Sequence, residues 1–288
     1  MTLSDLGRAR DEVGEVVAVE ELGGGLVELT AHLSHLAAHA RAGEFAQLRC
    51  GPGPVPLLRR PFSVAWVDGS HCSFVFERVG AGTGLLAAMR PGDMLGSLGP
   101  LGVGFTLDAS MRSVVCIAGG LGCAPFPLLV QQARALGVER VVVLHGAATA
   151  SRLYPSSRFV RGDAEGVHVV EATDDGSAGH HGLVVELIEA GIVGDVDAVY
   201  ACGPNPMLAA SAPLVLQHPD RPAPPGICEV SLEAPMGCGF GTCLGCTLPV
   251  RRPGDGTAWA LCCREGPVMP MQAVDWDVLR ALPPANVA

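Results

Sequence analysis

Apolar and polar positions alternate over short distances in the first third of the chain, and glycine-rich turns separate the short apolar runs. Short strands at close spacing, bounded by turn residues, are typical of a small antiparallel barrel. A short helix is predicted at 84–89, between the last two strands. The strands are predicted at 13–19, 26–30, 45–48, 63–67, 72–76 and 93–97.

The pattern changes after residue 107, where almost wholly apolar strands alternate with helices. Such alternation predicts a doubly wound parallel sheet. The proline-rich run at 219–225 is interpreted as a linker, and the cysteine-rich tail beyond it is too short to build a large core of its own. Strands are predicted at 113–118, 140–145, 167–171 and 198–202, with helices at 125–136 and 183–190.

The composition of the 288-residue chain fits a folded globular protein, since 49% of it is hydrophobic and only 17% is charged. Glycine and proline are frequent but follow no repeat, which excludes collagen-like and solenoid architectures. The net charge is −10, every basic residue is an arginine, and no basic block occurs. A role in nucleic-acid binding is therefore not expected.

One stretch without charged residues, 113–133, is long enough to suggest a membrane helix. It contains three glycines and two prolines, which would break a spanning helix near its middle. A buried strand, a glycine turn and a helix explain it better. Because residues 1–20 also lack the apolar core of a signal peptide, we expect a soluble, cytoplasmic protein without a membrane partner.

The most specific motif is formed by cysteines. Cys238, Cys243 and Cys246 follow the spacing C-x4-C-x2-C, and a further cysteine pair, Cys262 and Cys263, comes about sixteen residues later. This spacing is typical of a plant-type [2Fe–2S] cluster. The alternative, a zinc site, usually uses paired C-x2-C units, and one such unit is present. Adjacent cysteines cannot both point inward from an extended segment, and spacing alone does not choose the fourth ligand.

Two segments of the predicted barrel favour a flavin. The run Arg60-Pro61-Phe62-Ser63 starts a strand, and a guanidinium beside a hydroxyl suits a phosphate group. The second segment, ending in Gly82-Thr83, opens a short helix and offers backbone N–H groups to a pyrophosphate. Each segment alone is also compatible with an ordinary turn, but together they indicate FAD.

The predicted parallel sheet carries a nucleotide-binding pattern. A turn with Gly119, Gly120 and Gly122 follows one strand, and Cys202-Gly203-Pro204 ends another. Either turn alone could be a simple connection, but both should lie at the carboxyl edge of one sheet, where such folds bind nucleotides. We therefore expect an antiparallel FAD-binding barrel, an α/β nucleotide-binding domain and a small [2Fe–2S] module, at 1–108, 109–222 and 223–288.

In this order the motifs resemble those of the electron-transfer subunits of class 1B dihydroorotate dehydrogenases, within the ferredoxin–NADP reductase-like superfamily. The resemblance covers most of the chain and includes Gly43-Glu-Phe45, Arg60-Pro-Phe-Ser63, Gly82-Thr83, Gly99-Pro-Leu-Gly-Val-Gly-Phe105, Gly119-Gly-Leu-Gly122, Ala172-Thr-Asp-Asp-Gly176, Cys202-Gly-Pro204, Met236-Gly-Cys238 and Gly266-Pro267-Val268.

The resemblance also implies individual site residues. The step Cys263-Arg-Glu-Gly-Pro267 is similar to the family's last cluster cysteine and the residues after it, which favours Cys263 as the fourth ligand. Contacts to FAD are implied for Arg60, Pro61, Phe62, Ser63, Val75, Phe76, Glu77, Gly82 and Thr83. Family members tend to have Tyr-Arg where this chain has Phe76-Glu77, which puts side-chain contacts to FAD at these positions in doubt.

The activity implied by the resemblance is that of an NAD-linked oxidoreductase subunit in pyrimidine (UMP) biosynthesis. A separate catalytic subunit would oxidise dihydroorotate on FMN, and electrons would cross the cluster and FAD to reach NAD⁺. A flavin is needed between the other two centres, because nicotinamide exchanges two electrons at once and the cluster exchanges one. The assembly implied contains two copies of each subunit, and no residue of this chain is expected to act on dihydroorotate.

Two other functions fit the same motifs. One is an NAD(P)H-dependent reductase subunit that serves a ferredoxin- or hydrogenase-type complex. The other is a non-catalytic redox sensor. In a sensor, NADH need not reduce the flavin. The choice of nucleotide is also open, because the loop at 145–152 has no acid for a ribose hydroxyl, whereas Ser151 and Arg152 could accept a 2′-phosphate. The resemblance favours NAD(H).

Overall fold

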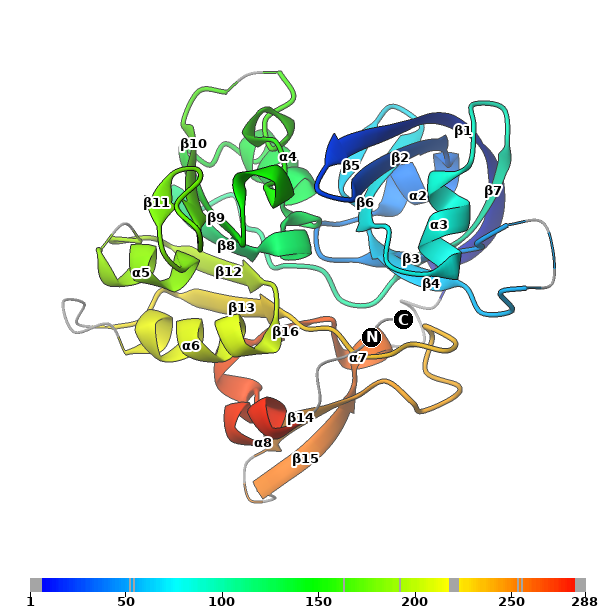
Figure 1. Cartoon of the computed structure of the whole chain (residues 1–288). Helices are drawn as coiled ribbons and strands as arrows, with labels where there is room; N and C mark the ends of the chain where they lie inside the picture. Colours follow the sequence, from blue (N-terminus) through cyan, green and yellow to red (C-terminus); the bar gives the residue numbers. More distant parts are fainter. Residues whose placement is uncertain are drawn as a thin grey trace.

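The structure is a computed structural model that describes residues 7–51, 53, 55–162, 164–191, 193–217, 223–252, 254 and 256–282. Figure 1 shows a curled antiparallel sheet beside a parallel sheet, with a smaller cysteine-rich part below both. No described helix is long and apolar enough to cross a membrane.

The first part is the expected antiparallel barrel, open along one side. Its strands are hydrogen-bonded in the order β4-β3-β7-β1-β2-β6-β5. A glycine turn joins β1 and β2, and the short α3 lies between β6 and β7, as predicted. The elements are β1 Arg10–Gly23, β2 Leu26–His32, α2 Ser34–His39, β3 Phe45–Leu48, β4 Arg60–Ser63, β5 Trp66–Asp68, β6 His71–Glu77, α3 Ala81–Ala87 and β7 Met94–Leu101.

The second part is the expected parallel sheet, with strands in the order β11-β10-β9-β8-β12-β13-β16. Within this sheet, β16 is the one described strand that runs antiparallel to its neighbour. The elements are β8 Ser113–Gly119, α4 Phe126–Ala135, β9 Arg140–Ala147, β10 Val167–Thr173, β11 His180–His181, α5 Val184–Glu189, β12 Ala198–Cys202, α6 Asn205–Leu216, β13 Ile227–Ser231 and β16 Val268–Pro270.

The tail contributes to this sheet. Both β13 and β16 come from the range 223–288, which we had assigned to a separate module. The described remainder is a hairpin with short helices, too small to bury further apolar strands, so β13 and β16 extend the larger sheet instead. The remaining elements are β14 Thr247–Arg252, β15 Gly256–Leu261, α7 Cys262–Glu265 and α8 Trp276–Ala281.

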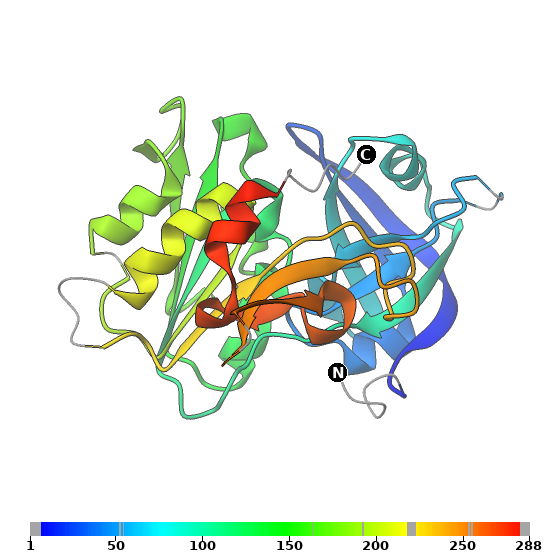
Figure 2. The ribbon, with the colours of Figure 1, turned by 90° about the horizontal axis from the view of Figure 1, so that it is seen from below.

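The segment between β13 and β14, residues 232–246, holds Cys238, Cys243 and Cys246 and is called the cluster segment here. Figure 2 shows it lying along the barrel, away from α5 and α6. A side chain of the barrel contacts it, because a Cβ atom on Gly239 would come 2.6 Å from Nε2 of Gln47 on β3. The cluster segment is therefore in contact with the antiparallel barrel.

The barrel and the parallel sheet share one hydrophobic core. The same cluster of buried side chains includes Leu29 of β2, Phe126 of α4 and Tyr200 of β12. The phenol ring of Tyr200 meets the ring of Phe105, in the connection between the parts, at a centroid distance of 5.1 Å. Continuous packing of this kind fixes the orientation of one part against the other.

A buried carboxylate adds a polar contact between the same two parts. Glu28 of β2 is only 2% exposed, and it pairs with Arg158 at 2.7 Å and with Arg161. The hydroxyl of Tyr154 donates a weaker hydrogen bond to it at 3.4 Å. These three partners all lie in the connection between β9 and β10. The barrel therefore contacts a long loop of the parallel sheet.

Replacing Glu28 with glutamine is expected to destabilise the chain by about 1.5–3 kcal/mol, because hydrogen bonds between charged groups are lost while both arginines stay partly buried. Thermal unfolding of the purified chain measures this change. Glu20, the exposed second partner of Arg158, provides the control, since Glu20→Gln should cost less than about 1 kcal/mol. Equal effects of the two substitutions would contradict the role given to Glu28.

Candidate functional site

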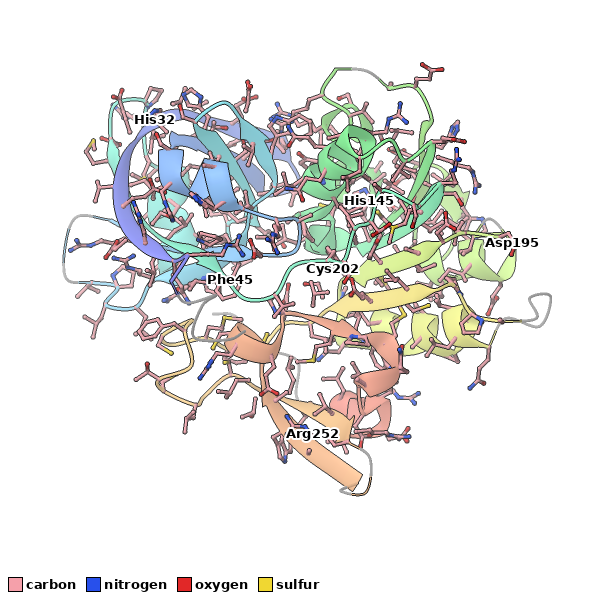
Figure 3. The ribbon with its side chains drawn as sticks, turned by 180° about the vertical axis from the view of Figure 1, so that it is seen from behind. His32, Phe45, His145, Asp195, Cys202 and Arg252 are labelled. Carbon is pink, nitrogen blue, oxygen red and sulfur yellow. The ribbon has the colours of Figure 1, made fainter. Side chains whose placement is uncertain are left out.

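A cavity of about 540 Å³ lies where the barrel, the parallel sheet and the cluster segment meet. Its wall combines an apolar surface with a few polar groups, as is usual for cofactor sites. Figure 3 shows Phe45 of the barrel and Cys202 of the parallel sheet on the two sides of this region. The wall residues are Phe45, Pro61, Phe62, Ser63, Val75, Phe76, Glu77, Val79, Thr83, Leu121, Ala124, Pro125, Cys202, Ser231, Leu232, Glu233, Ala234, Met236 and Pro267.

Most of the residues predicted to contact FAD line this cavity. They come from β4, β6 and the start of α3, and they are Pro61, Phe62, Ser63, Val75, Phe76, Glu77 and Thr83. The rings of Phe62 and Phe76 pack with centroids 5.3 Å apart. The strands β4 and β6, which carry most of these residues, therefore form one side of the cavity.

Arg60 and Gly82 lie outside the cavity wall but next to each other. A Cβ atom on Gly82 would be 3.4 Å from Cγ of Arg60. Thr83 organises the same turn, because its hydroxyl oxygen accepts hydrogen bonds from the N–H groups of Val79 at 3.0 Å and Gly80 at 3.1 Å. The side chain of Arg60 and the glycine turn, predicted from distant segments, are thus neighbours, and Nη1 of Arg60 donates to the carbonyl oxygen of Leu58 at 3.0 Å.

The predicted nucleotide residues meet at the carboxyl edge of the parallel sheet. Strands β8 and β12 are neighbours, with Ala118 opposite Cys202. A Cβ atom on Gly122 would lie 2.2 Å from the carbonyl oxygen of Cys202, so only glycine permits this approach of the two turns. Cys202 lines the cavity, whereas Gly119, Gly120, Gly122, Gly203 and Pro204 are not among the lining residues.

The thiols of the cluster segment and α7 form pairs. The N–H group of Cys243 donates to Sγ of Cys238 at 3.4 Å. The sulfur atoms of Cys246 and Cys263 are 3.2 Å apart, and the N–H group of Cys263 donates to Sγ of Cys246 at 3.4 Å. Within the described residues, no three His, Cys, Asp or Glu side chains are gathered closely enough to hold a metal ion without rearrangement.

Cys262 and Cys263 point in different directions. Sγ of Cys262 donates to the carbonyl oxygen of Leu232 at 3.4 Å and is fully buried. Burial raises the pKa of this thiol well above its ordinary value, which keeps it protonated at neutral pH. Of the two adjacent cysteines, Cys263 is the one whose sulfur atom contacts the sulfur atom of another cysteine of the motif.

The cluster segment favours the ionised form of one thiol. Burial by itself raises the pKa of Cys238, but hydrogen bonds from the backbone of Cys243, Phe240 and Thr242 outweigh it and lower the pKa to about 6. A thiolate is the form that binds iron. Sulfur atoms that accept hydrogen bonds from backbone N–H groups, as those of Cys238 and Cys246 do, fit the ligand chemistry of a [2Fe–2S] cluster.

The same segment contains an uncommon backbone conformation. Among the described residues, Leu244 is the one non-glycine residue with a positive φ, at 57°. It lies between Cys243 and Cys246, and its side chain is exposed. Such conformations are disfavoured for a branched side chain and are concentrated at functional sites.

The sequence did not lead us to one wall of the cavity. Residues 231–234 and Met236 come from the end of β13 and the segment after it, and β13 was not predicted as a strand. The alternation of apolar and polar residues over 227–232 was the available signal. This wall contains Glu233, whose side chain remains exposed. The cavity therefore has an acidic group that the motif analysis missed.

Arg152, considered above as a contact for a 2′-phosphate, already has a partner. Its Nη2 atom lies 2.6 Å from Oε1 of Glu77. Glu77 is the residue that departs from the family pattern, and it comes from the barrel, 75 positions away in the sequence. The ion pair crosses from the barrel to the loop after β9 and leaves the positive charge of Arg152 compensated.

Comparison with known proteins gives consistent results. Residues 233–275 match the model of the iron–sulfur cluster binding domain of dihydroorotate dehydrogenase B. The dihydroorotate dehydrogenase B (NAD(+)) electron transfer subunit of Bacillus caldolyticus is 39% identical over 230 residues, which cover 78% of this chain and 83% of that protein. The subunit of the same name from Desulforamulus reducens is 38% identical over 245 residues, covering 84% and 89%.

Solved structures agree on the fold. A structure of an NADH-dependent reduced ferredoxin-NADP oxidoreductase superposes with a TM-score of 0.78 at 24% identity and covers 94% of this chain and 92% of that chain. A ferredoxin reductase of carbazole 1,9a-dioxygenase gives 0.63 at 21% identity, covering 74% and 67%. The ferredoxin reductase-like fold expected from the motifs is confirmed, as is the resemblance itself. By the extent and level of its identity to the relatives, this chain belongs to the family of electron transfer subunits of dihydroorotate dehydrogenase B (NAD(+)).

Proposed function

We propose that this chain takes electrons from a dihydroorotate dehydrogenase catalytic subunit and delivers them to NAD⁺. One observation carries the proposal: a single cavity is lined by the barrel, by the carboxyl edge of the parallel sheet and by the segment that leads to the cluster cysteines. A cofactor in that cavity is in reach of both a nucleotide and a cluster. When bound, FAD exchanges two electrons with nicotinamide and single electrons with a [2Fe–2S] centre.

The chain's own residues bind and separate these groups. The turn of Arg60 and Gly82 holds the flavin phosphates, and the surfaces of β4 and β6 hold the rest of the cofactor. The turns at Gly119–Gly122 and Cys202–Pro204 hold NAD(H). Burial raises the pKa of the Cys202 thiol, so that it stays neutral at the cavity wall.

The cluster would be held by Cys238, Cys243, Cys246 and Cys263, and it would supply one-electron transfer. The contact of Cys263 with Cys246 supports this assignment, and the engagement of Cys262 with Leu232 opposes the alternative.

The partner is the catalytic subunit that oxidises dihydroorotate on FMN, in an assembly with two copies of each subunit, and the pathway is pyrimidine synthesis. The curated relatives are named as subunits of that enzyme. We also propose a cytoplasmic location. All eleven cysteines are free thiols, including buried ones, which fits a reducing compartment.

Purification with the co-expressed partner tests the function directly. Adding dihydroorotate and NAD⁺ to the complex should produce NADH, and the catalytic subunit alone should not. A complex that holds iron and FAD but forms no NADH would favour a reductase that serves another partner. If NADH also failed to bleach the flavin of the chain, a sensor role would be favoured.

The cluster assignment predicts that purified protein contains about two irons and two labile sulfides per chain. Cys263→Ser should lose the cluster signal in the visible and EPR spectra or weaken it strongly, because serine is a poor ligand for this type of iron. Cys262→Ser is the matched control, since it changes the adjacent thiol that points to Leu232. The reverse result would make Cys262 the fourth ligand, and zinc in place of iron would remove the assignment.

Arg60→Ala should weaken FAD binding about ten- to hundred-fold, because a charge-assisted hydrogen bond to phosphate contributes roughly 1.5–3 kcal/mol. Retention of flavin during dialysis, followed by fluorescence titration, measures the loss. Arg49→Ala removes a nearby exposed arginine and should leave FAD binding unchanged. Equal FAD retention in both variants would assign the phosphate contact elsewhere.

The ion pair of Glu77 with Arg152 predicts a preference for NADH over NADPH. Glu77→Gln should free the guanidinium and raise the efficiency of flavin reduction by NADPH roughly tenfold relative to NADH. Stopped-flow reduction, after the FAD content has been checked, gives both rates. The double variant Glu77→Gln with Arg152→Ala should lose the gain. An unaltered chain that already prefers NADPH would contradict the prediction.

A further inference from the structure

Gln47 of β3 is a buried amide without a partner. Its side chain is 0% exposed. Neither its amide nitrogen nor its amide oxygen has a hydrogen-bond partner among the described residues. Buried polar groups are almost always paired in folded proteins, because leaving one unpaired forfeits its hydration. This amide therefore indicates a group that binds next to it.

The amide lies against the cluster segment. A Cβ atom on Gly239 would be 2.6 Å from Nε2 and 3.0 Å from Cδ of Gln47, so the amide fills the space that any larger residue would need. Gly239 directly follows Cys238. The neighbouring N–H groups of the segment are already directed at Sγ of Cys238, so the segment concentrates donors around sulfur here.

Strand geometry places the same amide next to the flavin cavity. Side chains two residues apart lie on one face of a strand. Phe45 lines the cavity, and it is two residues before Gln47, whereas Ala46 and Leu48 belong to the barrel core on the opposite face. Gln47 thus lies between the cavity wall and the cluster segment.

We propose that Nε2 of Gln47 donates a hydrogen bond to a sulfur atom of the [2Fe–2S] cluster on its Cys238 side. The proposal rests on the cluster proposed above. Reduction adds one electron to the cluster, delivered by the partner's flavin, and increases the negative charge on sulfur. A hydrogen-bond donor stabilises the reduced form more than the oxidised form, so Gln47 raises the reduction potential of the cluster.

The test is a redox titration of the FAD- and iron-loaded chain, with the EPR signal of the reduced cluster as the readout. Gln47→Met keeps a similar volume but removes the donor, and we expect its midpoint potential to be more negative than that of the unaltered chain. Ser97→Ala is the matched control. Ser97 is also fully buried with an unpaired hydroxyl, and it lies on the adjacent β7, opposite Leu48, so its loss should leave the potential unchanged.

A second measurement needs no substitution. In protein whose glutamine side chains carry ¹⁵N, pulsed EPR of the reduced cluster should detect a weak coupling to one side-chain nitrogen. Absence of that coupling, or an unchanged potential in Gln47→Met with full iron content, would overturn the proposal. Absence of iron from the unaltered chain would overturn the cluster itself and this proposal with it, whereas a cluster with no effect of Gln47 would leave the proposed function intact.

Discussion

The buried carboxylate of Glu28 and the core around it fix the angle between the barrel and the parallel sheet. Electron transfer through a flavin requires that a nucleotide and a cluster approach the same cofactor from different sides, so their binding surfaces must keep their positions. In this chain the surfaces belong to segments far apart in the sequence. Glu28 reaches two arginines about 130 positions further along, and the hydrophobic core is continuous between the same parts. The cavity depends on that packing, because each part supplies only one wall.

The pattern of apolar and polar residues along the sequence was sufficient to predict those strands whose signal is contained in a short segment. The strand β8 could be predicted from a run of apolar residues, and most barrel strands from short runs bounded by glycine turns. The strand predicted at 63–67 is instead divided between the end of β4 and the start of β5. The cysteine motif and the glycine turns could also be recognised from the sequence, because their spacing is short. The strands β13 and β16 were not predicted, because each is short and gains its stability from pairing with a distant strand.

The site shows the same division. The order of motifs led to most of the residues around the cavity, since each motif is contiguous. The ion pair of Glu77 with Arg152 joins the barrel to the loop after β9. It could not be predicted from the residues near either partner. The direction of the Cys262 side chain depends on a carbonyl group 30 positions earlier. Gln47 was missed for a similar reason, since its burial is a property of the assembled fold.

The participation of β13 and β16 in the parallel sheet has a consequence for how this chain can be divided. A fragment that ended at the proline-rich connection would leave β12 as an uncovered edge, although all of its residues are buried in the whole chain. An exposed apolar edge strand pairs readily with other chains and leads to aggregation. The cysteine-rich part can therefore not be removed as a unit, unlike a ferredoxin domain that is joined by a linker. Engineering that exchanges it for another electron carrier has to retain both strands and cut only around the loop and hairpin that carry the cysteines.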